Sequence, residues 1–360
     1  MRLFLSPPHM SGKELEYIQE AFESNYVAPV GLFLERFEKS VAKFVQAPAA
    51  LALCSGTAGL HLSLRLLGIG PKDKVAVSDF TFIASLSPIL YQGATPILIG
   101  CDESWQMDPN ALEEALQKER PKAVILTHIY GQSADVKSIK ELCERYGVHL
   151  IEDAAESLGT TFDGQYTGTF GILGVYSFNG NKLLTTGGGG VLVGPKELIE
   201  RARSLATQAR EPGVEWYEHK TYGYNYRLSN IAAAIGVAQM EVIEERIAKK
   251  RQIFAWYQEL LSEKASFMPE LPKSFGTRWL TTALFEANPL RILRELKKEK
   301  IESRPLWKPM HMQPLCKDFA YFGQKKEEEL FAKGLCLPSG TAMNKEDVQM
   351  VCEVIGRCLG

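Results

Sequence analysis

The apolar positions of the chain form two kinds of run. Short, almost continuously apolar runs predict buried strands, and longer runs with one apolar face predict helices between them. Strands of this kind are typical of a parallel sheet that helices cover on both faces. The strands are expected at residues 50–54, 74–77, 96–99, 123–126 and 149–151, and the helices at 55–67, 82–92, 110–118 and 136–146.

Outside this alternating region the pattern predicts further helices. A helix is expected to begin near Ser11, because SGKE has the spacing of a capping box with Glu14, and a second helix is expected at residues 32–45. Two strands, at 173–178 and 191–193, precede a helix at 195–206 and a long polar segment. Residues 231–261 are then predicted to form one long helix of the kind that often joins two domains.

The remainder of the chain gives mixed signals. An extended segment is expected at 278–285, a helix at 289–300 and a terminal helix from Asn344. The sequence thus predicts a large domain, residues 1–245, and a smaller α+β domain, residues 246–360.

Composition limits the classes of protein. The 360 residues are 45% hydrophobic and 23% charged, with a formal net charge of -2, which is typical of a soluble globular protein. The sequence has no basic field for nucleic acid and no apolar stretch long enough for a membrane span. Its seven cysteines are scattered without a CxxC pair. We therefore expect a cytoplasmic protein with no metal site, no nucleic-acid partner and no membrane insertion.

The stretch YSFNGNKLLTTGGGGVLVG, residues 176–194, holds the first candidate for chemistry. Lys182 lies on a tight connection between two predicted strands, with Ser177 and two threonines near it and four glycines after it. An amine nucleophile needs such a rigid base, with hydroxyl groups nearby to hold an anion. The alternative is a glycine-rich turn with a solvated lysine.

Three further features stand at strand ends or helix starts. Asp153 follows a buried strand and could bind a metal, cap a helix or pair with a protonated ring nitrogen. The segment CSGTAGLH, with Gly56 and Thr57, opens a helix whose N-terminus would suit a phosphate, or is a plain tight turn. Phe82 could stack on a flat cofactor or pack in the core.

Taken together, these features match the needs of pyridoxal 5'-phosphate. Its phosphate needs a helix N-terminus and hydroxyl groups, and its ring nitrogen needs a carboxylate that keeps it protonated. Its aldehyde needs a lysine with which to form a Schiff base. The four features occur in one chain, so the sequence predicts a pyridoxal-phosphate enzyme.

The chain resembles the DegT/StrS-type pyridoxal-phosphate sugar aminotransferases. The resemblance runs from LSPPHMSG to LCLPSGT and is most specific in SGTAGLH, IEDAAES, YSFNGNKLLTTGGGG and GYNYRLSNIAAAIGVAQ. It implies an α/β type I fold like that of aspartate aminotransferase, with a large mixed-sheet domain and a smaller C-terminal α+β domain. It also implies a homodimer with shared active sites.

The resemblance assigns roles to individual residues. Lys182 is implied as the Schiff-base lysine, which also moves a proton during a ping-pong reaction, and Asp153 as the partner of the ring nitrogen. Cofactor contacts are further implied for Gly56, Thr57, Phe82, Glu156, Ser177 and Asn230, the last reaching the phosphate of the neighbouring subunit.

The form SFNGNK, with ATQARE and WYEH, is similar to enzymes that aminate UDP-4-keto-6-deoxy-N-acetylhexosamines in pathways of the bacillosamine and legionaminic acid type. L-glutamate is the implied amino donor. Enzymes of the perosamine type more often have an aromatic residue at the position of Asn179. Substrate contacts are expected from Asn179, Glu156, Tyr130, His219, Arg227, Trp307 and His311.

Three other readings stay open from the sequence. One is a GDP-4-keto-6-deoxymannose aminotransferase of the perosamine type. Another is a regulator that binds pyridoxal phosphate without catalysis. The third is an NAD-dependent oxidoreductase, which only the alternation of strands and helices suggests, because no GxGxxG follows the first strand.

Overall fold

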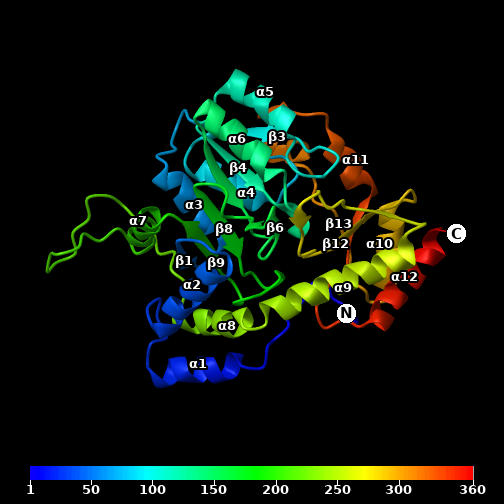
Figure 1. Cartoon of the computed structure of the whole chain (residues 1–360), viewed down its shortest axis with the longest axis horizontal. Coiled ribbons are helices and arrows are strands. Elements are labelled where there is room, and N and C mark those ends of the chain that lie inside the picture. The colour runs from blue at the N-terminus through cyan, green and yellow to red at the C-terminus, as the bar shows by residue number, and fades with distance from the viewer. Residues whose placement is uncertain (360) are drawn as a thin grey trace.

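An eight-stranded sheet forms the centre of the larger part of the molecule (Figure 1). The computed structural model describes residues 1–359. The strands lie in the order β1 (Ala49–Leu53), β9 (Gly190–Gly194), β8 (Leu173–Ser177), β5 (His149–Asp153), β4 (Ala123–Thr127), β2 (Lys74–Ser78), β3 (Thr95–Ile99) and β14 (Ala320–Phe322). Because β9 runs antiparallel to β1 and β8 while the other pairs are parallel, the sheet is mixed, as expected.

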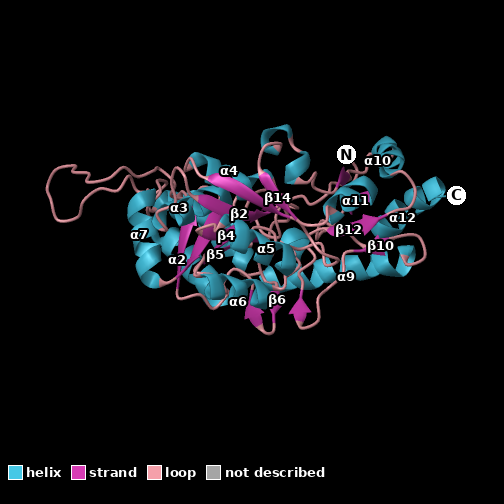
Figure 2. Cartoon of the chain, turned by 90° about the horizontal axis from the view of Figure 1, so that it is seen from above, coloured by secondary structure: helices cyan, strands magenta, loops and turns pink. Residues whose placement is uncertain are grey.

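Helices cover both faces of this sheet, as the apolar strands require (Figure 2). One face packs against α3 (Gly56–Leu66), α4 (Ile83–Tyr91) and α7 (Lys196–Ala206). The other face packs against α5 (Pro109–Glu119) and α6 (Val136–Tyr146) over one half, and against α1 (Glu14–Glu23), α2 (Leu32–Phe44) and α8 (Asn230–Met240) over the other. Within β1, alternate residues serve the two cores: Leu51 contributes to one and Ala52 to the other.

Two helix predictions are wrong. Helix α1 begins at Glu14 rather than near Ser11, because the Glu14 carboxylate accepts the backbone N–H groups of Ser11 and Gly12 at 2.7 and 3.0 Å. The single long helix expected at 231–261 is divided into α8 and α9 (Ile243–Leu261). At the break, the Glu241 carboxylate accepts hydrogen bonds from Lys13 and Tyr17 at 2.8 and 2.6 Å, so contacts with α1 hold the end of α8.

A second, antiparallel sheet forms the centre of the smaller part. Its order is β10 (Ser266–Phe267), β12 (Thr281–Leu284), β15 (Gly334–Leu337) and β13 (Arg304–Pro305). Helices α9, α10 (Pro289–Lys298) and α12 (Lys345–Leu359) share its apolar core, and α11 (Lys326–Lys333) precedes β15. The remaining strands, β6 (Thr161–Phe162), β7 (Gln165–Tyr166) and β11 (Ser274–Phe275), form a small separate sheet.

Two segments cross the predicted domain boundary at residues 245 and 246. Leu3 forms a β-bridge with Ile301, so the N-terminal segment lies with the smaller part. Strand β14 pairs with β3 and so belongs to the large sheet. The division itself stays a prediction. Among the helices of residues 1–359, none combines the length and apolar character that crossing a membrane needs.

Candidate active site

A cavity of about 410 Å³ lies where the parallel strands of the large sheet end. In open α/β sheets this edge is the usual place for a ligand. The cavity lies next to the turn after β1, the start of α4, and the segments after β5 and β8. Nine of the residues predicted from the sequence line it: Gly56, Thr57, Phe82, Asp153, Glu156, Ser177, Asn179, Lys182 and Trp307.

Lys182 lies on the turn between β8 and β9. Its backbone N–H donates to the carbonyl of Asn179 at 3.0 Å, which fixes the turn. Its Nζ donates to Oε1 of Glu156 at 3.3 Å and stands 3.9 Å from the centre of the Trp279 ring. The Trp279 Nε1–H donates in turn to the carbonyl of Asn181 at 2.7 Å. The amine is therefore held between a carboxylate and an aromatic face, with 13% of the side chain exposed.

The glycines after Lys182 allow β9 to approach the first turn of α3. A methyl group at Gly190 would overlap the backbone nitrogen of Gly56 and the carbonyl group of Ser55. Gly187 has φ +82°, a left-handed conformation that favours glycine. The lysine turn and the N-terminus of α3 consequently form adjacent walls of one cavity.

The N-terminus of α3 is arranged to receive an anion. Ser55 caps the helix, since its Oγ accepts the N–H of Ala58 at 3.1 Å. The first amides of a helix have no partner within the helix, and they carry the positive end of its dipole. Ser177 is adjacent: a Cβ placed at Gly56 would lie 3.6 Å from the Ser177 Cβ. Backbone N–H groups and hydroxyls thus converge where a phosphate would fit.

The Asp153 carboxylate faces the cavity from the end of β5. It accepts hydrogen bonds from the Ser85 hydroxyl at 2.6 Å and from the backbone N–H of Ala155 at 3.1 Å. Burial raises the pKa of Asp153, while these two donors and the charge of Lys182 lower it. A buried carboxylate of this kind is stabilised by a positive partner such as a protonated ring nitrogen.

Glu156 connects the lysine to the opposite wall. While Oε1 accepts from Lys182, Oε2 accepts the backbone N–H of Tyr130 at 2.8 Å. The Tyr130 hydroxyl accepts the backbone N–H of Trp307 at 2.8 Å, and the Trp307 ring lies 5.1 Å from that of Phe82. Burial raises the pKa of both Glu156 and Tyr130. Tyr130 therefore supports the cavity from behind.

Comparison with known proteins identifies the family. The model of the DegT/DnrJ/EryC1/StrS aminotransferase family matches residues 8–356. The chain belongs to this family. It is similar to EpsN of Bacillus subtilis strain 168, named as a pyridoxal phosphate-dependent aminotransferase, with 48% identity over 98% of this chain and 95% of EpsN.

Two further relatives of the DegT/DnrJ/EryC1/StrS family are informative. GDP-perosamine synthase of Escherichia coli O157:H7 is 35% identical, over 97% of this chain and 96% of that protein. The crystal structure of the aminotransferase TlmJ from Streptoalloteichus hindustanus superposes with a TM-score of 0.93 at 28% identity, covering 99% of this chain and 98% of that one. These comparisons confirm the type I fold and a pyridoxal-phosphate-dependent sugar aminotransferase.

The cavity fits the cofactor of the DegT/DnrJ/EryC1/StrS family. The N-terminus of α3 and the Ser177 hydroxyl suit its phosphate, the buried Asp153 its ring nitrogen, and Lys182 its aldehyde. Phe82, with 48% of its surface exposed, presents a ring to the cavity. When bound, pyridoxal phosphate supplies an electron sink for the carbon that loses a proton.

Five predicted site residues lie outside the cavity of this chain. Tyr130, expected to contact the substrate, is 1% exposed and does not line the cavity, because its ring is buried behind the wall. Asn230 is 1% exposed and caps α2, because its Oδ1 accepts the N–H groups of Phe33 and Leu34 at 3.0 and 3.3 Å. Arg227 pairs with Glu38 at 2.6 Å. Within one chain, the polar groups of both side chains thus serve the packing of α2 against the sheet.

The last two of these five are histidines. His219 belongs to the segment 207–229 between α7 and α8, which extends away from the rest of the molecule (Figure 1), and its ring contacts the carbonyl of Gln208 at 2.9 Å. His311 lies between Asp79 and Glu328, at 2.7 and 2.9 Å from their carboxylates.

Several residues of the site were not found from the sequence. Ser85 lies one helical turn beyond Phe82 and could have been found from that spacing. Trp279 and Arg304 also line the cavity, but they come from the smaller part of the molecule. No local pattern connects them with Lys182.

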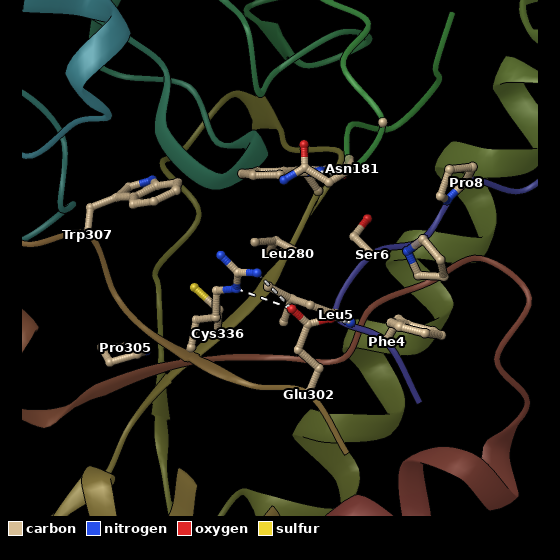
Figure 3. Close-up of a pocket in the computed structure, with 14 residues that line it drawn as sticks. Phe4, Leu5, Ser6, Pro8, Asn181, Leu280, Glu302, Pro305, Trp307 and Cys336 are labelled. Atoms are coloured by element: carbon tan, nitrogen blue, oxygen red, sulfur yellow. Dashed lines mark hydrogen bonds and ion pairs between the residues drawn. The ribbon is translucent and has the colours of Figure 1, made fainter. Parts of the chain in front are cut away.

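A second cavity of about 430 Å³ adjoins the first (Figure 3). The two share the lining residues Asn181, Trp279, Arg304 and Trp307. Figure 3 shows Trp307 on one side and Ser6, from the N-terminal segment, on the other. Arg304 pairs with Glu302 at 2.9 Å, and its side chain is 66% exposed. The family's site thus continues into a larger, mostly apolar space with one accessible cation.

Proposed function

We propose that this enzyme transfers the amino group of L-glutamate to the C4 ketone of a UDP-4-keto-6-deoxy-N-acetylhexosamine in the cytoplasm. The product would be a UDP-4-amino sugar for a surface glycan or a glycoprotein. The observation that carries the proposal is the position of Asn179 beside Lys182 in one cavity, within the motif SFNGNK. This motif is the part of the chain that most resembles the UDP-sugar enzymes.

Different residues of the chain have different roles in this reaction. The Lys182 amine moves a proton between the donor carbon and the cofactor, as general base and then as general acid. Glu156 orients that amine through its hydrogen bond of 3.3 Å. Asp153 keeps the ring nitrogen protonated, so that charge developing on the donor carbon is stabilised. The walls formed by Trp279 and Trp307 limit the access of water.

The second cavity supports a sugar nucleotide as the substrate. A nucleotide needs an apolar or stacking surface for its base and a cation for its diphosphate. Phe4 and Trp307 offer aromatic surface there, and Arg304 offers a guanidinium that is exposed at the point where the two cavities meet. The sugar would then lie between Arg304 and Lys182.

Exposed apolar side chains support a homodimer. Leu15, Phe22 and Leu32, on α1 and at the start of α2, are 80%, 59% and 64% exposed. The extended segment 207–229 adds Tyr217, which is 79% exposed. A contiguous apolar surface built from such side chains would be typical of an interface with another chain. In such a dimer Asn230 would reach the phosphate of the neighbouring site, as the resemblance to the family implies.

A GDP-4-keto-6-deoxymannose aminotransferase is the second candidate. It is favoured by the 35% identity to GDP-perosamine synthase over nearly the whole chain. The two candidates share the cofactor, the donor and Lys182. They differ only in the nucleotide and in the substituents of the sugar.

The deciding experiment offers the enzyme L-glutamate with a panel of UDP- and GDP-4-keto-6-deoxy sugars and identifies the product by NMR. Amination of the UDP-N-acetyl sugar is expected, and Lys182→Ala is the negative control. Amination of the GDP sugar alone would reject the UDP proposal. A bound cofactor with no half-reaction towards any amino donor would point to a regulator.

A further inference from the structure

Lys250, on α9, is a buried ammonium group outside both cavities. Its side chain belongs to the fully buried set, with the residue 2% exposed. Its Nζ donates to the carbonyls of Ser339 and Trp279 at 2.7 and 2.8 Å and to the Ser6 hydroxyl at 3.1 Å. An ammonium group has three N–H donors, so all of them are used. Within residues 1–359 no carboxylate forms an ion pair with Lys250.

A lysine at this position is costly to the fold. Burial without a negative partner disfavours the charged form and lowers the pKa of Lys250 to about 7. Packing alone would be better served by an apolar side chain of the same length, since α9 already contributes Ile253 and Tyr257 to its core. The three hydrogen bonds must therefore make connections between chain segments that an apolar residue at this position could not make.

These bonds tie together three segments of the chain that also contact one another directly. Ser6 belongs to the N-terminal segment that walls the second cavity, and Trp279 lines both cavities. Ser339 donates its backbone N–H to the carbonyl of Leu5 at 2.7 Å and accepts the N–H of Thr281 at 2.9 Å. The ammonium thus links the ends of β12 and β15 to the N-terminal segment.

Trp279 connects Lys250 to the catalytic amine of Lys182. Lys250 holds its backbone carbonyl, the carbonyl of Asn181 holds its ring N–H at 2.7 Å, and its ring lies 3.9 Å from Nζ of Lys182. Trp279 is therefore held both at its backbone carbonyl and at its ring N–H. A shift of its backbone would move the aromatic surface that faces the amine, and small displacements of such groups have large effects on rate.

We propose that Lys250 is a positioning residue of the aminotransferase, which holds the Trp279 ring over Lys182 and the Ser6 wall over the second cavity. Lys250 acts through these two residues and touches neither the cofactor nor the sugar. The proposal rests on the family's cofactor chemistry, and its kinetic test also uses the proposed amino donor, L-glutamate.

The test compares Lys250→Met with Lys249→Met in the enzyme loaded with pyridoxal phosphate. Lys249 lies on the same helix, but its Nζ contacts Gln252 at 3.3 Å and the Trp256 ring, away from both cavities. For Lys250→Met we expect an altered visible circular dichroism of the bound cofactor and a half-reaction with L-glutamate about tenfold slower per bound cofactor. Lys249→Met should change neither. A lower melting temperature with unchanged circular dichroism and rate would overturn the proposal.

A double-mutant cycle tests whether Lys250 acts through Trp279. Trp279→Leu alone should slow the half-reaction, and adding Lys250→Met should slow it little further, because the two residues form one unit. Fully additive effects would contradict the proposal. The circular dichroism needs no donor, so a wild-type enzyme that is inert to glutamate would reject the proposed function while leaving this inference testable.

Ser6→Ala provides a test that does not depend on the folding of Lys250→Met. It removes one acceptor of the ammonium and leaves the lysine in place. The expected result is a KM for the sugar nucleotide raised about threefold, with the glutamate half-reaction unchanged, since Ser6 walls only the second cavity. An unchanged KM would overturn the role assigned to Ser6.

Discussion

The Ser85 hydroxyl donates a hydrogen bond of 2.6 Å to Oδ2 of Asp153. Ser85 lies on α4 one turn beyond Phe82, whose ring is exposed to the cavity. The short helix α4 therefore both places an aromatic side chain at the cavity and stabilises the buried carboxylate that we expect to pair with the ring nitrogen of the cofactor.

Loss of this bond should shift the pH dependence of the enzyme. The Ser85 hydroxyl lowers the pKa of Asp153, which burial raises, so Ser85→Ala leaves that carboxyl with a higher pKa. The acid limb of the profile of kcat/KM should move to higher pH, and the affinity for pyridoxal phosphate should fall about tenfold. Asp153→Asn should lower the affinity for pyridoxal phosphate far more. The control is Ser87→Ala on the same helix; a Ser85→Ala profile equal to that of the control would contradict the prediction.

Lys182→Ala should abolish turnover, with a loss of at least about a thousandfold in kcat. The variant can bind the cofactor only non-covalently, so borohydride reduction should leave no cofactor on the protein in mass spectrometry. Lys118→Ala, at an exposed position on α5, is the matched control. Turnover retained by Lys182→Ala would reject the assignment of the catalytic amine.

Gly190→Ala should weaken both the fold and cofactor binding. Its added methyl group would overlap the backbone of Gly56 and Ser55, which cannot move without displacing the first turn of α3. We expect a loss of about 2 kcal/mol in the free energy of unfolding, together with a higher dissociation constant for pyridoxal phosphate. Gly70→Ala has no atom within 4 Å of its added Cβ and is the control for denaturant unfolding. Equal stability of the two variants would show that β9 does not need a glycine there.

His311 should stabilise the fold in a way that depends on pH. Its hydrogen bond to Asp79, reinforced by Glu328 and Glu327, raises the pKa of His311 to about 9. Burial raises the pKa of Asp79 to about 6, so above that pH the pair is a cation and a carboxylate. Because the folded-state pKa of His311 exceeds the unfolded value of about 6.5, its contribution is lost as the pH rises from 6.5 through 9. The ion pair is fully formed between about pH 6, where Asp79 ionises, and pH 6.5.

The measurement is urea unfolding of wild type and His311→Asn at matched cofactor occupancy. The stability difference between the two should fall by about 1 kcal/mol for each pH unit between about 6.5 and 9. His149→Asn, at the exposed start of β5, is the matched control. A difference that stays constant over this range would mean that His311 is not protonated in the native state.

The sequence predicted the cofactor side of the site because its residues follow strand ends. Asp153 and Ser177 end the strands β5 and β8, and Lys182 lies between β8 and β9, so the fold alone brings them together. Trp279 and Arg304 could not be predicted, since their position depends on how the smaller part packs against the large sheet. Such contacts leave no periodic signal in the chain.

Polar residues with distant partners were the hardest to place from the sequence. Asn230 stands in a motif of the family, but the backbone that its amide binds within this chain belongs to residues near position 30. In the same way, an apolar pattern that continues through Glu241 concealed the break between α8 and α9, which depends on contacts with α1. The local pattern of apolar residues predicts the presence of a helix or strand well, but it predicts the residues at which that element begins and ends poorly.

The place of β14 at the edge of the large sheet has a consequence for biosynthesis. Its partner β3 is synthesised long before Ala320–Phe322. Until then, one edge of the sheet presents unpaired backbone groups to other nascent chains. The sheet can be completed only after Ala320–Phe322 has left the ribosome, so folding should be sensitive to any truncation that removes this strand.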